Sequence, residues 1–182
     1  MEWVLLSKDK KGFVLYPSGR NFFPFGFNYD HDTNGRLIED YWHEEWDKIV
    51  NDFKEMKELG ANVVRVHLQF GKFMKSPNEV NSKEIERLRS LILLAEKLNI
   101  YLYITGLGCY RKEEVPLWYD KLSEKERWDA QAAFWEAVSV VCSKSPAVFC
   151  YDLMNEPVVP ASPQKDWLAS PFDKMHFVQF IT

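Results

Sequence analysis

The sequence predicts an α/β fold in which parallel strands alternate with amphipathic helices. Three observations support this prediction. Short apolar segments recur about every 40 residues, segments with helical periodicity lie between them, and no connection between consecutive units has hairpin length. Parallel strands joined by helices form either an open doubly wound sheet or a closed (β/α)8 barrel.

Each element is expected where apolar periodicity agrees with the residues at its boundaries. A short hairpin is expected within residues 8–20, with its turn at 17–19. Strands are expected at 23–28, 62–68, 100–105 and 147–154. Helices are expected at 46–59, from Ser82 as the capping residue to 98, and at 126–142. The side chains expected to face inward from the last helix are Trp128, Ala132, Trp135, Val138 and Val141.

The composition is that of one folded domain. The chain has 182 residues, of which 46% are hydrophobic and 27% charged, with 23 Lys and Arg against 27 Asp and Glu. These values argue against long disorder and against nucleic-acid binding. No apolar run approaches the roughly 20 residues of a membrane-spanning helix, so no membrane association is expected. Three cysteines without Cys-x-x-Cys spacing predict neither a disulfide framework nor a metal site.

The cellular compartment is left open by the sequence. The first six residues lack the basic segment and the long apolar stretch of a signal peptide. This start and the unpaired cysteines favour a cytoplasmic location. An extracellular location stays open if the true N-terminus lies upstream.

The expected second strand carries two polar side chains on one face. Alternation places Val64, Val66 and Leu68 on one side, and Arg65 and His67 on the other. Both faces of an open parallel sheet are covered by helices and should be apolar. In a barrel, inward side chains near the C-terminal ends of strands reach the active-site mouth. A site role is therefore favoured for Arg65. For His67, a site role and a position as a core histidine are equally good interpretations.

The expected fourth strand ends in Asn155, Glu156 and Pro157. A glutamate at the tip of a strand can enter a partly dry cleft, where desolvation keeps it protonated as a general acid. The amide before it can donate to a substrate hydroxyl. The proline restricts Glu156 to extended conformations.

Another carboxylate, Asp152, lies on the same face of this strand as Glu156. Four residues of strand separate the two by about 13 Å, which is too far for a pair of catalytic carboxylates. Asp152 is therefore interpreted as an interior charge that needs a partner, and Arg65 is one candidate. The other carboxylates at this end of the strands are interpreted as solvated loop residues: Asp30, Asp32, Glu113 and Glu114.

Several polar and aromatic residues follow the expected strands. Residues expected to line a substrate cleft, with His67, are Asn28, Tyr29, His31, Tyr110 and Trp118. Loop packing is an equally good interpretation of each aromatic residue. Gly106-x-Gly108 does not continue as a dinucleotide motif, because Arg111 occupies the third glycine position, so no cofactor is expected.

Three stretches of the chain carry a resemblance to a known family. They are 25–29 (FGFNY), 60–65 (GANVVR) and 151–157 (YDLMNEP). With these stretches the chain resembles the N-terminal half of a clan A glycoside hydrolase, in particular of glycoside hydrolase family 5, the cellulase and mannanase family.

This resemblance implies a fold and a set of roles. It implies the first four units of a (β/α)8 barrel, with residues 1–182 as the N-terminal part of one catalytic domain that is monomeric when complete. It implies a retaining enzyme for β-linked poly- or oligosaccharides, with Glu156 as acid/base, Asn155 binding substrate and Arg65 supporting the nucleophile. The nucleophile of such enzymes is a glutamate on the seventh strand, so the isolated chain is expected to be inactive.

Two departures keep alternatives open. Many family members have a histidine at the end of the third strand, where this chain reads ITGLGCY over 104–110. This difference leaves the substrate subfamily open. The missing nucleophile also allows a carbohydrate-binding pseudoenzyme with the same barrel. A third alternative is an unrelated open α/β domain that binds a nucleotide, which would have helices on both faces of its sheet.

Overall fold

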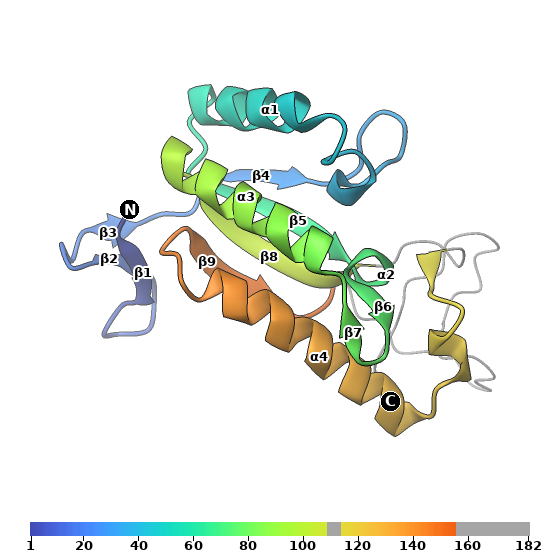
Figure 1. Ribbon diagram of the computed structural model, residues 1–182. Helices are drawn as coiled ribbons and strands as arrows, with labels where there is room; N and C mark the ends of the chain where they lie inside the picture. The colour runs from blue at the N-terminus through green and yellow to red at the C-terminus, as the bar shows by residue number, and fades with distance from the viewer. Residues whose placement is uncertain (109–113, 156–182) are drawn as a thin grey trace, which may run out of the picture.

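The computed structural model describes residues 1–108 and 114–155. Its centre is a four-stranded parallel sheet in the order β4-β5-β8-β9, which is also the order of these strands in the chain (Figure 1). The strands are β4 (Gly26–Tyr29), β5 (Val63–Gln69), β8 (Tyr101–Gly108) and β9 (Val148–Asp152). Gly26 permits close pairing of β4 with β5, because a Cβ there would lie 1.6 Å from the carbonyl oxygen of Val63.

Three helices connect these strands and cover one face of the sheet (Figure 1). They are α1 (Trp46–Glu58), α3 (Ser82–Leu98) and α4 (Glu124–Cys142). Their buried side chains form one core with Val64, Val66 and Leu68 of β5. A doubly wound sheet would have helices on both faces. Within the described residues the packing is therefore that of a partial barrel.

The helix ends differ from expectation in ways that capping explains. Asn81, not Ser82, is the N-cap of α3, and its side chain accepts a hydrogen bond from the backbone N–H of Lys83. α4 starts at Glu124 because Ser123 and Glu126 form a reciprocal capping box. α1 ends at Glu58, one residue before the expected end, because Leu59 is its C-cap, and the Leu59 side chain is 61% exposed.

The inward face of α4 also differs from expectation. Val138 and Val141 are buried as expected, but nearer the N-terminus of the helix the buried residues are Ala130 and Phe134. Trp128 is 52% exposed, Ala132 is exposed, and Trp135 is only partly buried against the core. Apolar residues lie on several sides of this helix, so its periodicity did not identify the buried face.

Short elements complete the described chain. An antiparallel sheet contains β1 (Trp3–Leu6), β2 (Phe13–Tyr16) and β3 (Asn21–Phe22). After β5, the chain forms α2 (Phe70–Phe73) and an antiparallel pair of β6 (Met74–Ser76) and β7 (Glu79–Val80). Two 3₁₀ turns are η1 (Ile38–Asp40) and η3 (Tyr119–Lys121). None of the described helices is long and apolar enough to span a membrane.

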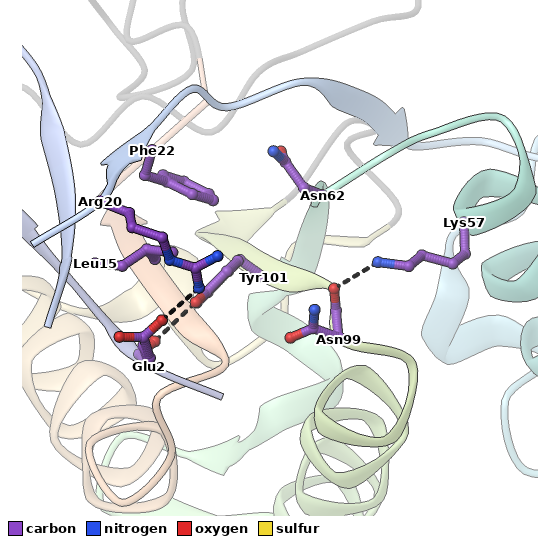
Figure 2. A pocket seen from close by; sticks show the side chains of 8 residues that line it. All are labelled: Glu2, Leu15, Arg20, Phe22, Lys57, Asn62, Asn99 and Tyr101. Carbon is purple, nitrogen blue, oxygen red and sulfur yellow. Dashed lines mark hydrogen bonds and ion pairs between the residues drawn. The ribbon is translucent and has the colours of Figure 1, made fainter. Parts of the chain in front are cut away.

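The antiparallel sheet lies against the N-terminal ends of the parallel strands (Figure 1). Phe22 of β3 packs with Val63 and Tyr101, at the start of β5 and β8. The Tyr101 hydroxyl donates to the backbone carbonyl of Glu2 over 2.8 Å, and Arg20 pairs with the Glu2 carboxylate. Glu2, Arg20, Phe22 and Tyr101 are among the residues that line a cavity of about 230 Å³. Figure 2 shows these side chains. In a (β/α)8 barrel this end of the strands serves stability, whereas active sites lie at the opposite end.

We expect the isolated 182-residue polypeptide to associate in solution. Both edges of the described parallel sheet, β4 and β9, have unpaired backbone groups, and Phe25 and Leu153 beside them are 58% and 66% exposed. Size-exclusion chromatography with light scattering should give a mass above 21.5 kDa that falls on dilution. A concentration-independent monomer that melts cooperatively would contradict this prediction.

Candidate active site

The face of the parallel sheet opposite the helices has two rows of side chains near the C-terminal ends of its strands. Strand register aligns Asn28, Arg65, Tyr103 and Cys150 in the first row. The same register aligns His67, Thr105 and Asp152 in the second row, closer to the strand ends. Alternation along β5 thus places Arg65 and His67 on the face opposite the helices, as the sequence predicts.

The Arg65 guanidinium lies at the centre of these rows. Its Nε donates to Thr105 Oγ1 over 2.8 Å. Its Nη2 donates to two acceptors, Asp152 Oδ2 at 2.7 Å and Asn155 Oδ1 at 2.8 Å. The expected partnership of Arg65 with Asp152 is therefore present, and both side chains are about three-quarters buried.

The guanidinium determines how two amides are oriented. Arginine has only donors, so the atom of Asn155 that faces Nη2 is its oxygen, and the NH₂ group points away from Arg65. Asn28 Oδ1 likewise faces Arg65 Nη1 at 3.4 Å and His67 Nε2 at 3.0 Å. Because Asn28 presents an acceptor to the imidazole, Nε2 is the nitrogen that carries the proton. Burial and the nearby Arg65 charge lower the pKa of His67 to about 4, so the ring is neutral at pH 7.

Asp32, in the loop after β4, is engaged in local ion pairs. Asp32 Oδ2 lies 2.8 Å from Arg36 Nη2 and 2.9 Å from Lys48 Nζ. The Arg36 backbone N–H and these cations hold the pKa of Asp32 well below its usual range. Asp30 Oδ1 lies 2.9 Å from Nδ1 of the exposed His31. Asp32, expected to be solvated, is instead a mostly buried structural anion.

The structure does not bring every expected residue to Arg65. Tyr29 is the last residue of β4 and faces α1, where its ring packs on Phe53 and its hydroxyl donates to Asp52. Trp118 is partly buried against the core and packs on Phe70. We therefore leave Tyr29 out of the proposed site. Tyr110 and Glu156 lie outside the described residues.

Comparison with known proteins assigns the family. The family model for cellulase, glycosyl hydrolase family 5, matches residues 19–179. The chain belongs to glycosyl hydrolase family 5. This match includes the three stretches that carry the resemblance and both polar rows around Arg65. The comparison with curated proteins found no match.

Solved structures of other proteins share the fold of this family 5 chain. GH5_18 from Bifidobacterium longum subsp. longum is 21% identical, with a TM-score of 0.66 over 78% of this chain and 35% of that chain. An exo-beta-1,4-mannosidase from Opitutaceae bacterium strain TAV5 is 21% identical, with a TM-score of 0.66 over 79% of this chain and 27% of that chain. A beta-1,4-D-mannanase from Cryptopygus antarcticus is 16% identical, with a TM-score of 0.67 over 93% of this chain and 49% of that chain. The chain thus spans less than half the length of each of these proteins.

Two contributors to the hydrogen-bond network around Arg65 were missed from the sequence, as was the buried Glu39, which lies outside that network. Thr105 bonds Arg65 and Asp152, and the Tyr103 ring lies 5.3 Å from the Arg65 guanidinium carbon. Both share the parity of inward side chains on β8, so alternation along 101–105 could have identified them. Glu39, in a loop segment without periodicity, offered no such pattern.

Glu39 is a fully buried carboxyl group that joins η1 to the end of β5. Its two oxygens accept hydrogen bonds from the backbone N–H of Gln69 at 2.8 Å and from the Gln69 side chain at 3.2 Å. Burial raises the pKa of Glu39 to about 8 despite these donors. In the described residues, this bond pair ties the loop after the first parallel strand to the C-terminal end of the second.

We expect Glu39 to make stability fall as pH rises from about 4.5 to 8. In this interval the unfolded chain has released the Glu39 proton, whereas the folded chain still binds it, so deprotonation favours unfolding. Denaturant melts of the full-length gene product should show the free energy of unfolding falling relative to Glu39→Gln, by up to about 1.4 kcal/mol per pH unit. A difference between the two proteins that is independent of pH would contradict the assignment.

Proposed function

We propose that residues 1–182 form the N-terminal part of the catalytic barrel of a retaining glycoside hydrolase that cleaves a β-linked poly- or oligosaccharide. In this proposal the chain supplies the first four β/α units, preceded by the short N-terminal hairpin. It also supplies the general acid/base, Glu156. The nucleophile comes from a later strand, outside these residues. The supporting observation is the Arg65 guanidinium bonded to Asn155, the residue directly before Glu156.

Each group has a distinct role in this mechanism. Glu156 protonates the glycosidic oxygen while the nucleophile attacks the anomeric carbon, and it then deprotonates the water that releases the glycosyl-enzyme. The outward NH₂ group of Asn155 donates to a sugar hydroxyl such as the 2-OH, and this bond strengthens in the transition state. Arg65, by family resemblance, also supports the nucleophile carboxylate.

Asp152 is a poor candidate for the missing nucleophile. Its Oδ2 accepts hydrogen bonds from Arg65 and from Thr105, and the residue lies four positions before Glu156. β9 ends at Asp152, and its carboxylate oxygen is engaged by both of these donors, which disfavours attack on a sugar.

The choice of substrates to test follows from the structural neighbours. The Opitutaceae protein is an exo-beta-1,4-mannosidase, the Cryptopygus protein is a beta-1,4-D-mannanase, and a GH5_18 variant from Bifidobacterium longum was solved with Manb1-4GlcNAc. We therefore place β-1,4-mannosides first in a panel that also contains β-glucosides and cello-oligosaccharides. Asn28, His67, His31 and Tyr110 are the proposed substrate contacts, whereas Trp118, which packs on Phe70, is left out with Tyr29.

Glu156→Gln in the full-length gene product should lower kcat/KM on a natural oligosaccharide by about 10²- to 10⁴-fold, because the leaving group then departs without a proton. An activated aryl glycoside needs no such proton, so its first turnover should be retained as a burst of aryl alcohol. Glu136→Gln on the exposed face of α4 is the matched control and should leave both rates unchanged.

Two results would overturn the assignment. Unchanged turnover of the oligosaccharide by the Glu156 variant would remove Glu156 from the mechanism. Oligosaccharide binding with no hydrolysis of any panel substrate by the unmodified protein would support a carbohydrate-binding pseudoenzyme instead.

A further inference from the structure

We propose that Thr105 and Asp152 are positioning residues that set the orientation of the Asn155 amide through Arg65. This inference rests on the proposed function, because it concerns a hydrogen bond to substrate in that reaction. Neither residue touches the sugar in this proposal. Their effect reaches the substrate only through the guanidinium and the amide.

Thr105 restrains the guanidinium at its Nε edge. Its side chain is fully buried, and its Oγ1 accepts from Arg65 Nε at 2.8 Å and donates to Asp152 Oδ2 at 3.2 Å. A hydroxyl has one hydrogen, so donating to Asp152 leaves its lone pairs directed at Arg65. The hydroxyl thus determines the rotation of the guanidinium plane about the Arg65 side chain.

Asp152 restrains the other edge of the guanidinium. Its Oδ2 lies 2.7 Å from Arg65 Nη2, the same nitrogen that donates to Asn155 Oδ1. This nitrogen has two hydrogens, and the two acceptors use both. When Asp152 takes one hydrogen, the direction of the other toward Asn155 is determined, and so is the outward direction of the Asn155 NH₂ group.

A purely structural role would give a different result from a positioning role. Removal of an ion pair that serves only stability would lower the fraction of folded protein. The measured rate would then fall by the same factor on every substrate. A positioning role instead acts on one bond, from Asn155 to a sugar hydroxyl. Loss of the positioning residue should therefore matter only when the substrate has that hydroxyl.

The experiment combines variants with a substrate that lacks the 2-OH. In the full-length gene product, Thr105→Val and Asp152→Asn should each lower kcat/KM by about 10- to 100-fold, as the loss of an outer partner does in other sites. The fall should be in kcat, with KM little changed, because the bond strengthens in the transition state. On the matching 2-deoxy glycoside the same variants should lose less than about 3-fold, and Thr105→Ser should restore the rate on the ordinary substrate.

Matched controls separate positioning from loss of folding. Ser145→Ala removes another buried hydroxyl, which precedes β9 and bonds Glu96 in the last turn of α3, at the opposite end of the strands from this network. Glu84→Gln changes another buried carboxyl group, which bonds Trp42. Both controls should lower stability and leave kcat unchanged. Equal losses on the ordinary and 2-deoxy substrates, unchanged kcat in both variants, or no restoration by Thr105→Ser would each overturn the proposal.

A spectroscopic measurement keeps the inference separate from the proposed function. If the unmodified protein hydrolyses no substrate, the proposed function fails, but the side-chain amide resonances of Asn155 still report its orientation. Thr105→Val and Asp152→Asn should both shift this ¹⁵N-labelled amide pair, whereas Ser145→Ala should not. Unshifted Asn155 resonances in both variants would overturn the positioning role.

Discussion

The arrangement of polar side chains near the C-terminal ends of the strands depends on one largely buried cation, Arg65. Arg65 lies on β5, an inner strand of the four-stranded sheet, and its bonds reach Asn28 on β4, Thr105 on β8, Asp152 on β9 and Asn155 beyond β9. A guanidinium on the inner face of a sheet is costly unless a carboxylate and further acceptors surround it. Asp152 provides the charge and the other groups complete the hydrogen bonds. The same arrangement therefore offsets the burial of Arg65 and orients the amides beside it.

The face of the sheet opposite the helices changes from apolar to polar along the strands. At the N-terminal ends, Val63 and Tyr101 are covered by Phe22 and form a small apolar cluster. One and two rows further along, the inward side chains are Arg65 and His67 with their partners. Because alternation brings only every second residue to this face, a seven-residue strand carries both a structural and a reactive segment. The antiparallel N-terminal sheet covers the first segment, and the second lies at the C-terminal ends of the strands.

Much of this arrangement could be predicted from the sequence, where one periodicity dominated. Alternation along β5 placed Arg65 correctly, and the need of a buried charge for a partner pointed to Asp152. Tyr29 was misjudged because β4 begins at Gly26 and extends to Tyr29, so that its last side chain turns toward α1 instead of entering a loop. The buried face of α4 was misjudged because apolar residues surround that helix. Glu39 could not be predicted, since its burial depends on a contact with Gln69, thirty residues away.

The distribution of these groups among the strands divides the site into two halves with different requirements. Asn28, Arg65, Thr105, Asp152 and Asn155 all belong to the first four parallel strands or follow them directly, and their mutual bonds need no other segment. The orientation of the Asn155 amide is therefore determined within this chain. In the proposed mechanism, the distance from the acid/base to a nucleophile would depend on how the sheet curves and closes, because a retaining pair tolerates only about 5–5.5 Å. The order around Arg65 is thus a local property of paired side chains, whereas the proposed catalytic distance is a property of a whole barrel.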